Sequence, residues 1–98
     1  MKELEQIRLE LDEVDREIVR LFEARMKLAQ EVAAYKIAHR LPVLDAGREE
    51  MVMASRVSML QDGHWASGVR SLYGEIMRLS REEQQRLLQE AKEAENHA

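Results

Sequence analysis

The sequence predicts an all-α protein with three helices per chain. First, apolar residues in the N-terminal third recur in alternating steps of three and four, which is the spacing of one side of a helix that packs against other helices. Second, the 98-residue chain has one proline, four glycines and 4% aromatic residues, which favours long helices over a β-sandwich. Third, 45% hydrophobic and 35% charged residues are typical of a soluble, helix-rich domain. The recurring residues, called the apolar stripe below, are Leu4, Ile7, Leu11, Val14, Ile18, Leu21, Leu28 and Val32.

The first helix is predicted from about residue 2 to residue 39. At about 1.5 Å per residue, such a helix would be roughly 50 Å long or more, whereas a domain of this size is normally far more compact. Two shorter helices of one chain cannot cover a rod of that length. We therefore expect a second copy of the chain to lie against it, which makes the protein an obligate homodimer.

Two further helices follow in the sequence. Pro42 ends the first pattern, because the residue before a proline disfavours helical backbone. Asp45 suits the N-cap of a second helix from about residue 46 to 60, and residues 61–64 have the composition of a turn. A third helix is predicted from about residue 66 to 93. With no repeat or linker along the chain, we expect one domain covering residues 1–98.

The composition also excludes several classes of function. A net charge of −4 argues against nucleic acid as a general partner, since phosphate binding needs a basic surface. No segment reaches the roughly 20 apolar residues that span a bilayer, and the N-terminus has no signal-peptide pattern, so no membrane partner is expected. The absence of cysteine suits a reducing compartment, and we expect a cytoplasmic protein. No metal site is predicted, because His39, His64 and His97 lack the spacing of metal ligands.

Arg25 stands where the apolar stripe should continue. An arginine on a packed helix face must be paired or must meet an anion, because an isolated buried charge is very costly. Lys36 lies about three turns further along the helix and on nearly the same side. Two cations on the inner face of an acidic helical protein predict a socket for an anionic small molecule.

The third helix repeats this anomaly with uncharged polar residues. Its inward face, followed from Val69 through Tyr73 and Ile76, reaches Ser80 and then Gln84 before it becomes apolar again. Helices usually bury apolar residues on such a face. Either residue alone could bond locally or lie near solvent at the end of the bundle. Together with the two cations of the first helix, Ser80 and Gln84 indicate a shared polar pocket.

The start of the second helix offers Asp45, Arg48 and Glu49, which can share one face. The alternative for this group is an N-cap with an exposed ion pair, which would contribute well under ~1 kcal/mol. Arg8 lies roughly 25 Å before Arg25 along the helix and on a different side. One small ligand cannot touch both arginines of the same helix, so Arg8 must act in the partner subunit if it serves this site. The alternative is an exposed arginine beside Asp12.

Taken in order, these features resemble the all-α chorismate mutases of the AroQ class. The resemblance covers about residues 4 to 88 and is carried by EQIRLELDEVD, LFEARMKLAQEVAAYK, PVLDAGRE and MRLSREEQQ. It implies an intertwined six-helix homodimer with two equivalent active sites, each completed by an arginine at the position of Arg8 in the partner. It also implies the rearrangement of chorismate to prephenate, on the route to phenylalanine and tyrosine, with no metal and no cofactor. Because no dehydratase, dehydrogenase or synthase domain is visible, a stand-alone enzyme is expected.

The resemblance also implies roles for the polar residues. Arg25 and the partner's Arg8 would clamp the substrate carboxylates, assisted by Arg48 and Ser80. Lys36 would contact a carboxylate and the ether oxygen, and Gln84 would donate a second hydrogen bond to that oxygen. Glu49 and the backbone near Asp45 would take the ring hydroxyl. The catalytic residues are then Arg25, Lys36 and Gln84.

Two alternative functions compete with this prediction. An isochorismate-pyruvate lyase would use a similar cationic pocket on the same scaffold, and we favour the mutase because the full set of polar positions is present. A non-catalytic helical dimerisation module would explain the amphipathic first helix. Arg25, Ser80 and Gln84 argue against that module, since they would weaken a coiled-coil interface without an obvious return.

Overall fold

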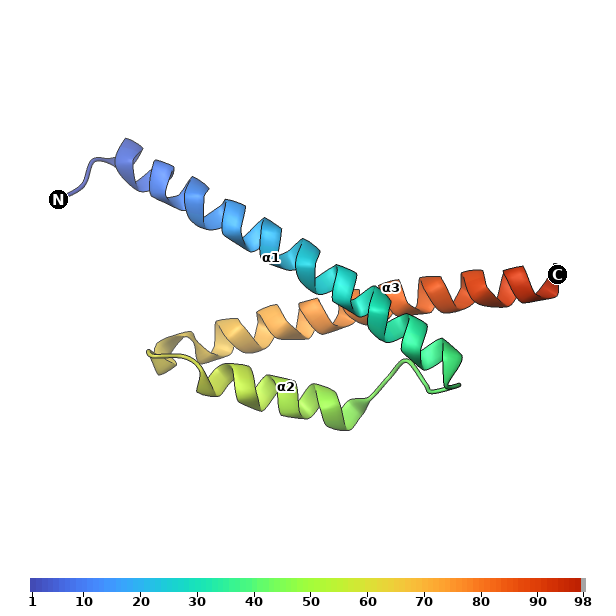
Figure 1. Cartoon of the computed structure of the whole chain (residues 1–98). Helices are drawn as coiled ribbons and strands as arrows, with labels where there is room; N and C mark the ends of the chain where they lie inside the picture. Colours follow the sequence, from blue (N-terminus) through green and yellow to red (C-terminus); the bar gives the residue numbers. More distant parts are fainter. Residues whose placement is uncertain (98) are drawn as a thin grey trace.

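The computed structural model describes residues 1–97, and this part of the chain is entirely helical, without a β-strand. Its elements are α1 (Leu4–Ala38), α2 (Ala46–Ser58), the short 3-10 helix η1 (Gly63–Trp65) and α3 (Ala66–Asn96), as Figure 1 shows. The predicted fold class and the three helices are therefore confirmed. No helix in residues 1–97 is long and apolar enough to cross a membrane.

Helix α1 begins and ends close to the predicted positions. Glu5 lies in its first turn and Lys36 in its last, and both charges interact favourably with the helix dipole. The helix stops in a Schellman motif, in which Leu41 N donates to Lys36 O at 2.8 Å and Arg40 N donates to Ile37 O at 3.3 Å. Arg40 adopts a φ of 55°, a left-handed conformation that glycine usually supplies. The chain thus leaves the helix before Pro42 is reached.

Capping by aspartates starts the next elements. Asp45 Oδ1 accepts a hydrogen bond from Arg48 N at 3.0 Å, as expected of the N-cap of α2. Asp62 Oδ1 accepts from His64 N at 2.9 Å and begins η1, where a simple turn had been predicted. Helix α2 ends at Ser58, two residues earlier than expected, and α3 continues to Asn96, beyond the expected residue 93.

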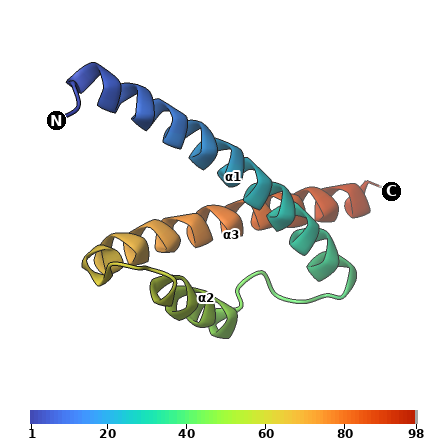
Figure 2. The ribbon, with the colours of Figure 1, turned by 60° about the vertical axis from the view of Figure 1, so that its left-hand side comes forward.

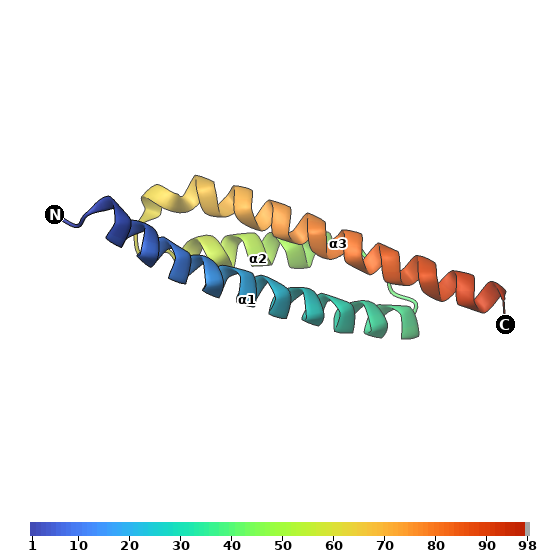
Figure 3. The ribbon, with the colours of Figure 1, turned by 90° about the horizontal axis from the view of Figure 1, so that it is seen from above.

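The molecule is long and thin, with extents of 64 × 28 × 15 Å. Its radius of gyration is 17.7 Å, whereas a compact domain of this length has about 13 Å. Helices α1 and α2 both pack against α3, and the N-terminal half of α1 projects away from the other helices (Figures 1 and 2). The view from above in Figure 3 shows how shallow the arrangement is.

The interior of the single chain is correspondingly small. The buried residues are Ala29, Ala33, Val43, Val52, Met77 and Gln84, and within residues 1–97 no large side chain is completely enclosed. Every residue of the apolar stripe is exposed, with fractions between 40% and 59%. The stripe was expected to pack against other helices, and within one chain it does not.

Candidate active site

One pocket of about 420 Å³ lies where the C-terminal half of α1, the start of α2 and the middle of α3 meet. This volume is in the range of small-molecule sites. The pocket contains every site residue predicted from the sequence except Arg8. The polar lining residues are Arg25 and Lys36 from α1, Asp45, Arg48, Glu49 and Arg56 from the α2 segment, and Ser80, Arg81 and Gln84 from α3.

The pocket is strongly cationic, although the whole chain carries a net charge of −4. Five basic side chains line it and only two acidic ones, so the local charge is opposite to that of the protein. Basic groups gathered in a concave site raise the local concentration of anions and favour their binding. The arrangement therefore suits a small ligand that carries more than one negative charge.

Two of the guanidinium groups share an aromatic neighbour. The Cζ atoms of Arg25, from α1, and Arg56, from α2, each lie 6.0 Å from the centre of the Tyr73 ring of α3. Such distances allow a cation–π attraction that steadies both side chains. Two like charges on one ring also repel each other, and an anion between them would remove that repulsion.

Lys36 is held at the other end of the pocket. Its Nζ donates a hydrogen bond to the backbone oxygen of Val43 at 2.6 Å, which ties α1 to the connection before α2. A lysine ammonium has three donors, so this bond leaves two for a ligand. Lys36 is half-buried and Val43 is buried, and their contact restricts the position of the charge.

Ser80 and Gln84 lie one turn apart on the pocket face of α3, as predicted. Gln84 is 6% exposed, and its Nε2 donates to Ser80 Oγ at 3.1 Å. Within residues 1–97, Gln84 Oε1 is buried and has no hydrogen-bond partner. Native proteins rarely leave a buried polar atom unpaired, and a ligand site is one of the places where they do. Gln84 is thus the one polar residue of the described pocket lining that is buried.

The start of α2 does more than cap a helix. Asp45, Arg48 and Glu49 all line the pocket, and Glu49 Oε1 pairs with Nη1 of Arg81 on α3 rather than with its neighbour Arg48. The alternative of an isolated exposed ion pair within α2 is therefore wrong for Glu49.

Arg8 lies outside this site, on the exposed N-terminal half of α1. Its Nη1 lies 3.5 Å from Glu5 Oε1, and its side chain is 62% exposed. Asp12 had been suggested as its neighbour, but the ion pair forms with Glu5. Arg8 can therefore reach such a pocket only in another copy of the chain.

Sequence reasoning missed two basic pocket residues, Arg56 and Arg81. The helical spacing of the sequence could have placed both on the pocket side of their helices. Arg56 lies four residues after Val52 on the same face of α2, and Arg81 lies between Ser80 and Gln84 on the pocket side of α3.

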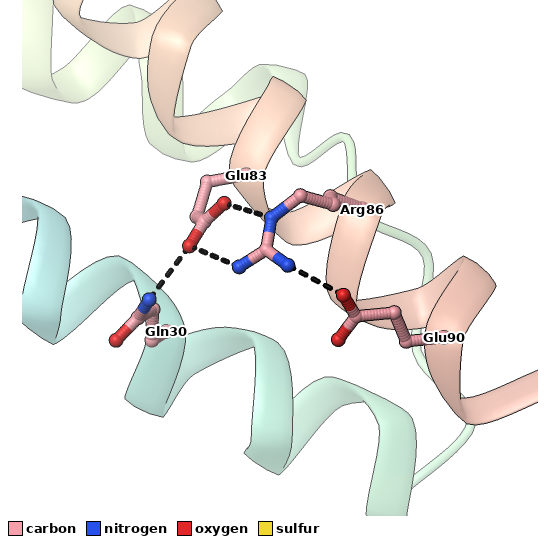
Figure 4. Close-up of polar contacts among 4 residues, drawn as sticks. All are labelled: Gln30, Glu83, Arg86 and Glu90. Carbon is pink, nitrogen blue, oxygen red and sulfur yellow. Dashed lines mark hydrogen bonds and ion pairs between the residues drawn. The ribbon is translucent and has the colours of Figure 1, made fainter. Parts of the chain in front are cut away.

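A polar clasp beside the pocket fixes the crossing of α1 and α3 (Figure 4). Gln30 Nε2 of α1 donates to Glu83 Oε2 at 2.6 Å, and Arg86 grips the same carboxylate through Nε at 2.7 Å and Nη2 at 2.9 Å. The Arg86 guanidinium, aided by Gln30, lowers the pKa of Glu83 to about 2. Because Glu83 immediately precedes Gln84, the clasp holds that part of α3 in place.

These observations define an all-helical protein with a cationic pocket of small-molecule size. No group of three or more possible ligand side chains in residues 1–97 could hold a metal ion. The chorismate mutase type II family matches residues 7–85. The T-protein of Haemophilus influenzae (strain ATCC 51907 / DSM 11121 / KW20 / Rd) is 33% identical over 81 residues, which cover 82% of this chain. The chain therefore belongs to the chorismate mutase type II family, a family of isomerases, and its resemblance to the AroQ class is confirmed.

The match covers 22% of the length of that T-protein, so the chain corresponds to one part of a much longer relative. No solved structure is significantly similar to this chain.

Proposed function

We propose that this protein is a chorismate mutase, which rearranges chorismate to prephenate in the biosynthesis of phenylalanine and tyrosine. The observation that carries the proposal is the cationic pocket with its buried amide, found in a chain of this family. Chorismate has two carboxylates, an ether oxygen and a ring hydroxyl, and the pocket offers groups suited to each. As a biosynthetic enzyme, it would act in the cytoplasm.

The chemistry needs positioning rather than a nucleophile or a proton shuttle. The rearrangement is concerted, since one C–O bond breaks while a C–C bond forms. The enzyme must hold the enolpyruvyl arm folded over the ring, and this restriction alone removes much of the barrier. Arg25 suits the task because a planar guanidinium can grip a carboxylate with two hydrogen bonds. Arg48 and Ser80 would assist at the carboxylates.

Lys36 and Gln84 would act on the ether oxygen, where negative charge grows as the C–O bond lengthens. Donors placed in advance around a developing charge stabilise the transition state, and one of them can be worth ~3 kcal/mol. The bond from Lys36 to Val43 and the bond from Gln84 to Ser80 provide this advance placement. Glu49 and the backbone near Asp45 would accept the ring hydroxyl.

The proposed active form is an intertwined homodimer. The exposed apolar stripe of α1 and the near absence of a core in one chain both support a second copy as the missing partner. The partner's Arg8 would then complete the pocket, because Arg8 of the same chain lies far from it along α1. Each dimer would contain two such sites.

A spectrophotometric assay of chorismate loss tests the proposal, with the product identified by chromatography. We expect prephenate to form without an added metal or cofactor. Salicylate and pyruvate from isochorismate, with no turnover of chorismate, would instead identify an isochorismate-pyruvate lyase. Loss of neither substrate would contradict both functions.

The variant Arg25→Leu separates an enzyme from a dimerisation module. Leucine continues the apolar stripe, so the fold should be kept, while kcat/KM should fall by about a hundredfold or more because a carboxylate loses its clamp. Arg20→Leu is the matched control, since Arg20 is exposed on the same helix and, among residues 1–97, pairs only with Glu17. The control should retain activity.

A further inference from the structure

An ion pair between Glu49 of α2 and Arg81 of α3 lies at the edge of the pocket. Within residues 1–97 it is the one ion pair that joins two different helices, since each of the others connects residues no more than eight positions apart in the sequence. The side chain of Arg81 is 34% exposed and that of Glu49 is 25% exposed, less than those of most other ion-paired residues. The pair is therefore partly withdrawn from water.

The neighbours of this pair indicate what it is for. Arg81 follows Ser80 directly on α3, and Glu49 lies one turn after Asp45 at the start of α2. Both members of the pair therefore adjoin other polar residues that line the pocket. A surface ion pair contributes little to stability, and partial burial adds a desolvation cost to that small gain. A purely structural pair would gain little from this location.

The geometry of the pair leaves one carboxylate oxygen available. Arg81 Nη1 donates a hydrogen bond to Glu49 Oε1, whereas Glu49 Oε2 accepts no hydrogen bond from any described residue. A carboxylate gripped at one oxygen has its rotamer fixed, and its second oxygen can still accept a hydroxyl donor. Arg81 also offsets the negative charge of Glu49, which would otherwise repel a dianion.

We infer that Arg81 is a positioning residue, which holds Glu49 by one oxygen and thereby presents the other oxygen to the ring hydroxyl of the substrate. The inference rests on the proposed function, because it assigns Glu49 to that hydroxyl. Arg81 acts through Glu49 and sets how strongly the site distinguishes a hydroxylated ring from one without the hydroxyl.

The test compares two bicyclic dicarboxylate mimics of the transition state, one with the ring hydroxyl and one without it. Calorimetry gives the dissociation constant of each for the full-length protein. The wild type should bind the hydroxylated mimic about tenfold more tightly or better, as expected for a hydrogen bond to a charged group. In Arg81→Met the ratio should fall close to one, because the hydroxylated mimic loses more affinity than the mimic without the hydroxyl, and both lose some affinity with the positive charge.

Three further variants sharpen the comparison. Arg78→Met is the matched control, since Arg78 is exposed on the same helix and pairs with Glu75 and Glu82, and it should leave the ratio unchanged. Arg81→Lys should restore part of the ratio, because lysine keeps the charge but lacks the fork. In a Glu49→Gln background, Arg81→Met should change the ratio no further.

The outcomes divide clearly. Equal weakening of both mimics by Arg81→Met would overturn the inference, because Arg81 would then bind a carboxylate directly or support the fold. If Arg81→Met does not fold, an unchanged ratio in Arg81→Lys would overturn it and a reduced ratio would support it. Failure of the wild type to bind either mimic would overturn the proposed function and the inference with it.

Discussion

Gln84 combines a buried position with hydrogen-bonding groups that the chain leaves free. Its Nε2 uses one N–H on Ser80 Oγ, which leaves a second N–H for a ligand, while Oε1 is unpaired among the described residues. A serine hydroxyl can donate as well as accept. A half-turn of the amide would therefore let Ser80 donate to Oε1 and would free both N–H groups for the pocket.

The variant Gln84→Glu should be more active at acidic pH than at neutral pH. Glutamine does not titrate, whereas a glutamate here donates to the ether oxygen only when it is protonated. The profile of kcat/KM against pH should fall as pH rises through the pKa of the new carboxyl, while the wild type stays flat around neutrality. Gln85→Glu, on the exposed neighbouring position, is the control. Full activity of Gln84→Glu at pH 8 would disprove the role of the amide.

Arg40 carries the backbone strain at the end of α1. Its φ of 55° places Cβ against the following carbonyl, a conflict that glycine avoids. Arg40→Gly should raise the free energy of unfolding by about 0.5–1 kcal/mol, because relief of strain exceeds the added entropy of the unfolded chain. Urea unfolding at a fixed protein concentration measures the change. Arg40→Ala keeps Cβ and should give no such gain, so an equal gain in both variants would point to the lost charge instead.

At the residue scale, sequence reasoning identified polar groups that interrupt an apolar pattern. Arg25, Ser80 and Gln84 break the periodicity of their helices, and all three line the pocket. Arg81 escaped notice because it lies among other charged residues, where a basic side chain breaks no pattern, whereas Arg56 was overlooked although it is the one charged residue in residues 51–61. The Glu49–Arg81 contact spans 32 positions, and no local period reports a contact of that kind. The roles of all these residues in catalysis stay predictions.

At the scale of the elements, the crossing of α1 and α3 depends on the clasp around Glu83. In the folded chain the pKa of Glu83 is lowered from 4.5 to about 2 by Arg86 and Gln30. A depressed carboxyl pKa stabilises the fold above the unfolded-state pKa, and this contribution is lost as pH falls through the folded-state pKa. The relevant window thus runs from about pH 4.5 down to about pH 2.

Glu83→Gln should therefore destabilise the protein near neutrality but not in strong acid. The difference in free energy of unfolding between wild type and variant should be present at pH 6 and should shrink toward zero near pH 2. Urea titrations across this range, at one protein concentration, measure it. Glu50→Gln is the control, since Glu50 is exposed and forms no ion pair with a described residue. A difference for Glu83→Gln that stayed constant with pH would contradict the clasp.

Helix locations were predictable because each helix has its own local signals. Periodicity located α1, Asp45 marked the start of α2, and the chain after Asp62 returned to a helical pattern. The helix ends differ from prediction by a few residues, since fraying and capping depend on contacts that periodicity does not report. The Schellman motif at Arg40 was not foreseen, because arginine is an uncommon residue at such a position.

At the scale of the whole molecule, the single chain has a very small hydrophobic core. Its radius of gyration exceeds that of a compact domain, and its longest helix exposes a continuous apolar stripe. Length and periodicity in the sequence foretold this shape, because a helix of that length cannot be covered by two shorter ones. They could not foretell the arrangement of two copies, which depends on how exposed side chains fit together.

Mixing two inactive variants tests whether the pockets are shared between copies. If each site takes Arg8 from one chain and Arg25 from the other, Arg8→Ala and Arg25→Ala are each inactive alone. In a mixed dimer, however, one site collects both changes and the other is intact. Random exchange of chains makes about half of the dimers mixed, so activity should recover to about a quarter of wild type. Arg25→Ala mixed with Arg48→Ala is the control, because both residues come from the same chain and no intact site can form. Wild-type activity of Arg8→Ala alone would show that each chain forms its pocket without the partner's arginine. No recovery in the first mixture after proven exchange would show that Arg8 and Arg25 of different chains do not form one site.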